Sequence, residues 1–163
     1  MGRMAEYYMT EDGRRRRIVR RIPHTMFAEV TVAAATSGQS FNSGDLEHAM
    51  SEPFEIHRLY FNVTTLDSGA IPQADPNIGK REFVKVTVEL TGGSKKMTHS
   101  AHRLSDFGSA DSRVWDWEEP LVLDRSEGFS ITADNSLAAS AAAGGVRVEA
   151  SFYGYLLVLG DFE

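Results

Sequence analysis

Alternating apolar and polar residues mark several β-strands in this chain. In EFVKVTVEL, residues 82–90, valine or leucine occupies every second position from Val84 to Leu90, with lysine, threonine and glutamate between them. Such strict alternation is typical of a strand with one buried face. The glycines Gly92 and Gly93 that follow end the predicted strand.

The stretch PFEIHRLYFNVTTL, residues 53–66, is dense in aromatic and β-branched residues and predicts another strand. Its alternation changes phase, because Phe54 and Ile56 share one parity whereas Leu59 begins the other. A side chain changes face at each step along a strand, so a β-bulge near His57, or burial on both faces, would explain the change.

Three further segments have the residue types of strands: MFAEVTVAAA from Met26, LVLDRSEGFSITAD with a turn between Ser126 and Gly128, and VRVEASFYGYLLVLG from Val146. Gly154 in the last segment predicts a bend or the close approach of another backbone. Many short strands, unequal loops and little helical periodicity together predict an all-β protein. We expect an antiparallel β-sandwich of the jelly-roll type.

The segments between the strands give weaker predictions. Residues 36–44, TSGQSFNSG, have the composition of a linker. Residues 45–50 predict one helical turn, capped by Ser43 or Asp45. The polar residues 94–113 predict a long ordered connection.

The N-terminal segment is basic, whereas the rest of the chain is acidic. Residues 1–23 have a formal charge of about +4, and the remaining residues carry about −10, within a total of −6. With no helical stripe and no strong alternation, residues 1–25 predict an extended arm that orders on contact, followed by a sandwich domain over residues 26–163. The predicted partner-binding residues of this arm are its clustered arginines: Arg14, Arg15, Arg16, Arg17, Arg20 and Arg21.

The arginines of the arm have three possible uses. An acidic protein neighbour is favoured, because guanidinium groups form charge-assisted hydrogen bonds with carboxylates. Nucleic acid is a less favoured partner, since the body is acidic and the stacking residues Tyr7 and Tyr8 lie outside the basic run. A solvated tail without a partner is the third interpretation.

Composition narrows the function classes. The 163 residues suffice for one domain with a core, and the absence of cysteine excludes disulfides, thiol catalysis and cysteine-ligated metals. No apolar run is long enough for a membrane helix, and the first residues lack the apolar segment of a secretion signal. We therefore expect a soluble protein that is made in a cytoplasm and has no membrane partner.

The candidate catalytic residues have simpler structural interpretations. His99 and His102 have a spacing that would suit metal binding on a helical turn, but no carboxylate is placed to complete a set. His57 is better explained as a hydrogen-bonded structural histidine than as a buried base. Glu118 and Glu119 are adjacent, and neighbours in a strand point to opposite faces, so they do not form a glycosidase pair. We expect no catalytic residue, no metal and no cofactor.

Two tryptophans in RVWDWEEP offer either a binding platform or buried area. Trp115 and Trp117 have the same parity and would lie on one face of a strand. They could stack on sugars, but large aromatic residues also fill cores and subunit interfaces, and we favour this structural role. Together with Phe129, Phe152 and Tyr155, they are the predicted core or interface residues.

Three blocks, PFEIHRLYF, WDWEEPLVLDRSEGFSITADN and VRVEASFYGYLLV, resemble structural proteins of tailed bacteriophages that coat or cement capsids. The resemblance spans roughly residues 53–159. It implies a jelly-roll or related β body that assembles on the capsid surface, often as a trimer, and that reaches its neighbours with a terminal arm. It also implies the major capsid protein as the partner, assembly in the host cytoplasm, and no catalytic residues.

The leading hypothesis is therefore a non-enzymatic virion structural protein, a capsid decoration or cement protein that stabilises the shell. One alternative is a carbohydrate-binding or host-attachment jelly roll that uses Trp115 and Trp117. Another vertex, neck or tail component, or a nucleic-acid-binding accessory protein, also stays open.

Overall fold

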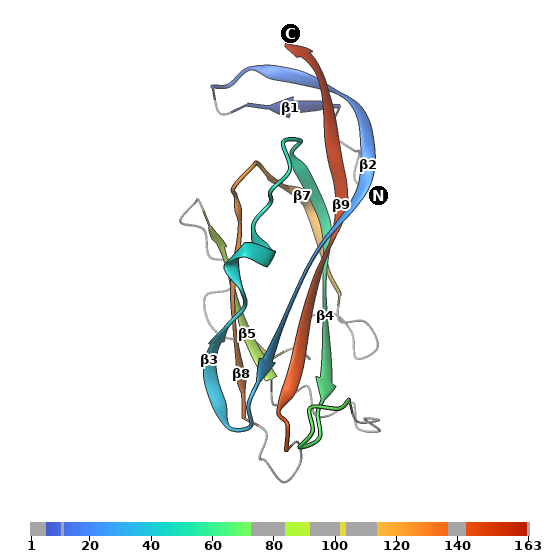
Figure 1. Cartoon of the computed structure of the whole chain (residues 1–163). Coiled ribbons are helices and arrows are strands. Elements are labelled where there is room, and N and C mark those ends of the chain that lie inside the picture. Colours follow the sequence, from blue (N-terminus) through green and yellow to red (C-terminus); the bar gives the residue numbers. More distant parts are fainter. Residues whose placement is uncertain are drawn as a thin grey trace.

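The computed structural model describes residues 6–10, 12–72, 84–91, 102–103, 114–136 and 143–162, and for residues 102–103 and 114–118 it describes the backbone alone. Most of these residues lie in β-strands (Figure 1). The elements in chain order are β1 (Tyr7–Met9), β2 (Arg15–Val32), β3 (Thr36–Ser40), the 3-10 turn η1 (Ser43–Leu46), β4 (Phe54–Thr65), β5 (Val84–Thr91), β6 (His102–Arg103), β7 (Val114–Leu123), β8 (Gly128–Asn135) and β9 (Val146–Phe162).

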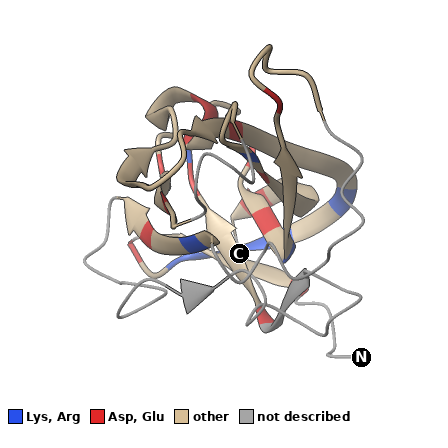
Figure 2. Cartoon of the chain, turned by 90° about the horizontal axis from the view of Figure 1, so that it is seen from below, with Lys and Arg blue, Asp and Glu red and all other residues tan. Residues whose placement is uncertain are grey.

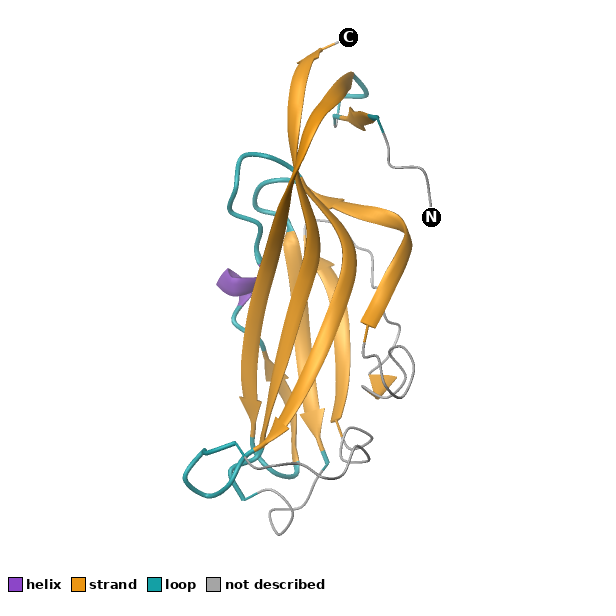
Figure 3. Ribbon diagram, turned by 90° about the vertical axis from the view of Figure 1, so that its right-hand side faces the viewer, coloured by secondary structure: helices purple, strands orange, loops and turns teal. Residues whose placement is uncertain are grey.

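The strands form two antiparallel sheets that face each other (Figure 3). The five-stranded sheet has the order β1-β2-β9-β4-β7, and the four-stranded sheet has the order β3-β8-β5-β6. Non-sequential neighbours such as β2 and β9 bring the two ends of the chain side by side. The all-β antiparallel sandwich predicted from the sequence is confirmed. Within the described residues, no helix is long and apolar enough to cross a membrane.

The core lies between the two sheets and is built from the alternating apolar positions of their strands. Val84, Val86 and Val88 of β5 are fully buried, as their alternation predicted. Across the sandwich, Phe129 of β8 stacks on Phe152 of β9, with ring centroids 4.4 Å apart. Both rings are at most 1% exposed. These aromatic residues, predicted for the core or an interface, join the two sheets at the centre of the core.

A β-bulge at His57 changes the phase of β4. Ile56 pairs with Gly154 and Arg58 pairs with Tyr153, so His57 is one extra residue relative to β9. The bulge explains how Ile56 and Leu59 both reach the core, and it confirms the bulge predicted near this residue.

Gly154 allows β4 and β9 to come together at this bulge. A Cβ atom on residue 154 would lie 1.8 Å from the backbone carbonyl oxygen of Glu55, which is far inside van der Waals contact. The close backbone approach predicted for this glycine is therefore confirmed.

The N-terminal segment differs most from its prediction. β2 runs without interruption from Arg15 to Val32, so it crosses the expected domain boundary between residues 25 and 26. Residues 15–25 are extended, as expected, but they pair with β9 of the same chain. The backbone hydrogen bonds of β9 order this basic segment, although its own sequence lacks strand alternation.

Two local predictions were wrong in detail. Residues 36–40, predicted as part of a linker, form the edge strand β3. The predicted helical turn is a 3-10 turn that begins two residues earlier in the chain, and its cap is Asn42, whose side-chain oxygen accepts a hydrogen bond from the Gly44 amide at 3.0 Å. Most of the predicted connection over residues 94–113 lies outside the described residues.

Candidate docking site on the terminal ribbon

The five-stranded sheet continues beyond the sandwich as a narrow ribbon. β4 pairs with β9 only as far as Leu156, whereas β2 pairs with β9 as far as Phe162. β1 adds a short third strand against Arg15 to Arg17. We call β1, residues 15–20 of β2 and residues 158–162 of β9 the terminal ribbon. It projects past the end of the sandwich in both side views (Figures 1 and 3).

Aromatic rings of the ribbon hold several of the predicted arginines. The guanidinium of Arg14 lies 4.1 Å from the ring centroid of Phe162, and that of Arg16 lies 4.9 Å from the same ring. Arg15 lies over Tyr7 at 5.2 Å. Each such cation–π contact at an exposed site contributes about 0.5–1 kcal/mol. These contacts restrict the side chains, and Nε of Arg16 also donates a hydrogen bond to the carbonyl of Gly160 at 2.8 Å, while Arg14 and Arg15 remain exposed to solvent.

The ribbon presents cations and apolar groups to solvent together. The side chains of Arg17 and Arg20 are exposed and make no hydrogen bond or ion pair within the described part of the chain. The large apolar residues that the ribbon exposes include Met9 at 55%, Val19 at 66% and Phe162 at 46%. The ribbon also carries one exposed acidic residue, Asp161, and further acidic residues are spread over the strands and loops of the sandwich (Figure 2).

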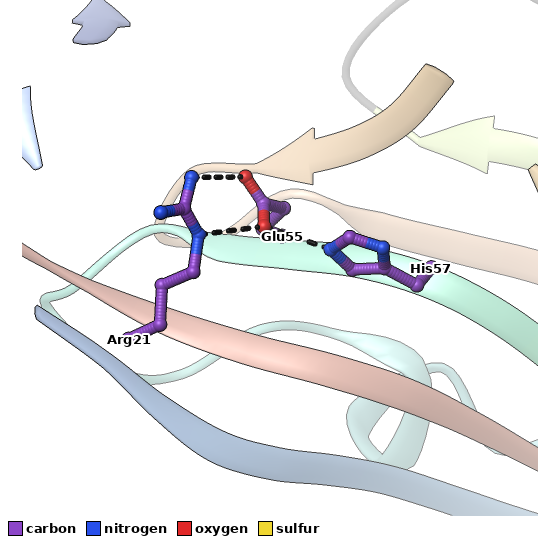
Figure 4. A network of polar contacts seen from close by, with 3 residues as sticks. All are labelled: Arg21, Glu55 and His57. Atoms are coloured by element: carbon purple, nitrogen blue, oxygen red, sulfur yellow. Dashed lines mark hydrogen bonds and ion pairs between the residues drawn. The ribbon is translucent and has the colours of Figure 1, made fainter. Parts of the chain in front are cut away.

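Arg21 has a different role from the other predicted arginines. Its Nε lies 3.1 Å from Oε1 of Glu55, and its Nη2 donates to Oε2 at 3.4 Å (Figure 4). Glu55 is only 3% exposed, and Nε2 of His57 lies 2.8 Å from the same Oε1 atom. A buried carboxylate requires such partners, so Arg21 stabilises the folded five-stranded sheet by compensating the charge of Glu55.

Tyr155 lies beside this network on the outer face of the five-stranded sheet. Its ring is perpendicular to that of His57, with centroids 5.4 Å apart, and it is partly exposed. Tyr155 was predicted for the core or an interface, and it packs over His57 on the outside of the sandwich.

A side-chain contact ties the start of the ribbon to the sandwich. The hydroxyl of Tyr8 donates a hydrogen bond to the carboxylate of Asp124, in the turn between β7 and β8. The amide of Ile18 donates to the carbonyl of Glu6 at 2.9 Å, which extends the pairing of β1. The ribbon is thus attached to the body by side chains as well as by strand pairing.

His24 and His48 form a pair that was not predicted from the sequence. His24 is edge-on to Phe54, with ring centroids 4.9 Å apart, and 6.1 Å from His48. His48 is 2% exposed, and its Nε2 donates to the carbonyl of Glu52 at 2.6 Å. Burial, and then the neighbouring His48, lower the pKa of His24 below its ordinary 6.5. The sequence offered one signal for this pair: His24 lies two positions from the buried Met26 and therefore on the same face of the strand.

Several predicted site residues lie partly or wholly outside the described residues. The backbone of Trp115 pairs with Leu59, but the side chains of Trp115 and Trp117 are not among those described. His99 lies outside the described residues, and for His102 only the backbone pairing with Val86 is given. Within the part of the chain that is described, no group of three or more histidine, aspartate or glutamate side chains is placed to hold a metal ion.

In comparisons with known proteins, no protein-family model, no curated protein and no solved structure matches this chain.

Proposed function

We propose that this chain is a non-enzymatic structural protein of a virion, a capsid decoration or cement protein. In this proposal, the terminal ribbon attaches the sandwich to the major capsid protein on the surface of the shell. The observation that carries it is the ribbon itself, which extends beyond the sandwich and exposes arginines such as Arg17 and Arg20 beside apolar residues such as Val19.

The chemistry of the ribbon favours an acidic protein surface as its partner. Exposed arginines provide charge-assisted hydrogen bonds to carboxylates, and neighbouring apolar side chains such as Met9 and Phe162 add buried area on contact. Nucleic acid would bind the same cations, but its phosphate backbone would make no apolar contact with the exposed aliphatic side chains. The ribbon is already paired with β9, so binding orders fewer residues than a free tail would require.

The strand order supports a jelly roll as the finer fold in this proposal. Leaving β1 aside, the remaining eight strands form the sheets β2-β9-β4-β7 and β3-β8-β5-β6. A jelly roll places its first, eighth, third and sixth strands in one sheet, and its second, seventh, fourth and fifth in the other, and these eight strands follow that order. This architecture occurs in viral capsid proteins and lectins, so it supports the proposal without deciding the partner.

A decoration protein of this kind stabilises a shell by mass action. Any molecule that binds the assembled shell more tightly than its free subunits shifts the equilibrium towards the shell. A rigid sandwich that is attached through a preformed ribbon can bridge neighbouring subunits without catalysing a reaction.

Quantitative mass spectrometry of purified particles tests the proposed function. A decoration protein is expected at a copy number comparable with that of the major capsid protein, because it follows the shell lattice. A few copies per particle would indicate a vertex, neck or tail component. Absence from purified particles would refute the proposal.

A further inference from the structure

The outer face of the five-stranded sheet carries an aromatic surface that the proposed function does not use. Phe27 of β2 is 50% exposed and Tyr153 of β9 is 44% exposed. Tyr60 and Tyr155 are partly exposed. We call this surface, from Thr25 to Glu29 on β2 and across β9 to β4, the aromatic face. Exposed aromatic side chains clustered on a rigid sheet mark interaction surfaces.

The strand register fixes the positions on this face. Three neighbouring rows run across β2, β9 and β4, and in this order they are Thr25–Tyr153–Arg58, Phe27–Ser151–Tyr60 and Glu29–Glu149–Asn62. The aromatic residues fill the middle of the face around Ser151. An exposed cation, Arg58, and an exposed anion, Glu29, occupy opposite corners.

This arrangement is complementary to itself. A twofold axis that passes over Ser151 and runs diagonally from the Thr25 corner to the Asn62 corner packs two copies of the face with their strands crossed at about 70°, close to the orthogonal class of sheet packing. With strands about 4.8 Å apart and a rise of about 3.4 Å per residue, the axis brings Tyr153 to within about 3 Å of the position over Phe27 of the second copy. The same rotation brings Arg58 to within about 6 Å of the position over Glu29 of the second copy, which these long side chains can span.

We propose that the aromatic face binds a second copy of this chain and forms a twofold dimer. Two aromatic contacts and two ion pairs then repeat across the axis, which places aromatic residues at the centre and charges at the rim, as in other protein interfaces. The charges of the face have both signs, and Glu55 neutralises Arg21 at its upper edge. This balance disfavours nucleic acid, which requires a net positive surface.

The size of the face sets the expected strength of the dimer. Three strands and three rows, with the side chains around them, cover a flat area of about 300 Å² by the dimensions of a sheet. Stable interfaces bury about 800 Å² on each partner, so a weak dimer with a dissociation constant in the micromolar range is expected.

Sedimentation velocity of the full-length chain, from about 1 μM to about 1 mM, tests the proposal. The mass is expected to rise from one chain to two with concentration. Phe27→Ser and Tyr153→Ser are each expected to weaken the dimer about tenfold or more. Val19→Ser is the matched control, because Val19 is 66% exposed on the same strand but lies on the terminal ribbon. A thermal melt of each variant verifies that it is folded.

A charge exchange tests the orientation. Glu29→Arg alone places like charges opposite each other in the dimer and is expected to weaken it, whereas adding Arg58→Glu is expected to restore it. Arg58 lies opposite Asp116 in the β4–β7 register, so the thermal melt separates any effect on folding from the effect on association.

Four results would overturn the inference: a monomer at the highest concentration, a trimer, a dimer that depends on Val19 and not on Tyr153, or binding of a glycan to the face of a chain that stays monomeric. The experiment uses no capsid. Its outcome is therefore independent of the proposed function.

Discussion

Replacing Arg21 with glutamine tests whether this arginine belongs to the fold. The variant removes the cation that pairs with Glu55 while keeping most of the side chain's volume. Arg21 and Glu55 are 34 positions apart in the sequence, and their ion pair joins β2 to β4 across β9.

The expected loss follows from the burial of the two groups. Removing one partner of a fully buried ion pair costs about 3–5 kcal/mol, because the remaining charge is left without compensation. The Glu55 side chain is 4% exposed, but that of Arg21 is 19% exposed, and His57 still contacts the carboxylate after the change. Both facts reduce the cost, so we expect Arg21→Gln to lower the free energy of unfolding by about 2 kcal/mol.

Urea unfolding followed by circular dichroism measures this difference, with an unchanged m-value as evidence of the same transition. Arg20→Gln is the matched control, because Arg20 is the adjacent residue on the same strand and is exposed. Its effect is expected to stay within about 0.5 kcal/mol. Equal losses for the two variants would refute the distinction between the arginine of the fold and the arginines of the ribbon.

Three further substitutions follow from the packing. Gly154→Ala places a Cβ 1.8 Å from the carbonyl oxygen of Glu55, so it is expected to lower the free energy of unfolding by about 3 kcal/mol or more in the same urea titration. Gly44→Ala is the control, because the nearest atom to its Cβ would be 3.5 Å away, and it is expected to change the free energy of unfolding little. Phe152→Ala removes half of the stacked pair at the centre of the core and is expected to cost about 3–5 kcal/mol, measured by calorimetry. Because the pKa of His24 is lowered in the folded state, protonation favours the unfolded chain: stability is complete above about pH 6.5 and falls as the pH decreases through the lower folded value, and His24→Phe is expected to flatten this part of the pH profile of the melting temperature.

The sequence was most informative where local pattern and tertiary structure agree. The alternation from Val84 to Leu90 predicted β5, and the phase change around His57 predicted the bulge, because both depend on which face of one strand is buried. Gly154 was recognisable because glycine weakens the interior of a strand. Its presence there indicates that another backbone leaves no space for a side chain.

Long-range partners explain what the sequence did not predict. Residues 15–25 have no strand pattern of their own. They are held extended by pairing with β9, which begins more than a hundred residues later in the chain. The separation of Arg21 from the other arginines depends on Glu55, and the pair His24 and His48 meets only after β2 and the segment following η1 fold together. Such contacts connect distant segments, so no local window contains them.

The terminal ribbon also changes how the docking hypothesis is best examined. Deleting residues 1–23 is the natural test for a free arm, but it would remove half of β2 and leave residues 155–162 of β9 without their partners on β2. Charge reversal at exposed positions leaves the strand ladder intact, because it changes side chains that lie outside the core.

The most direct measurement of the central claim, which rests on the proposed function, is the binding of the purified protein to capsid shells of the proposed virus prepared without it, by co-sedimentation at a fixed salt concentration. Reversing Arg17 and Arg20 to glutamate is expected to weaken binding about a hundredfold, while the same reversal at the exposed cations Lys85 and Arg125 of the sandwich is expected to change it about threefold or less. Equal affinities of the two double variants, with both folded, would contradict the claim that the terminal ribbon is the docking element.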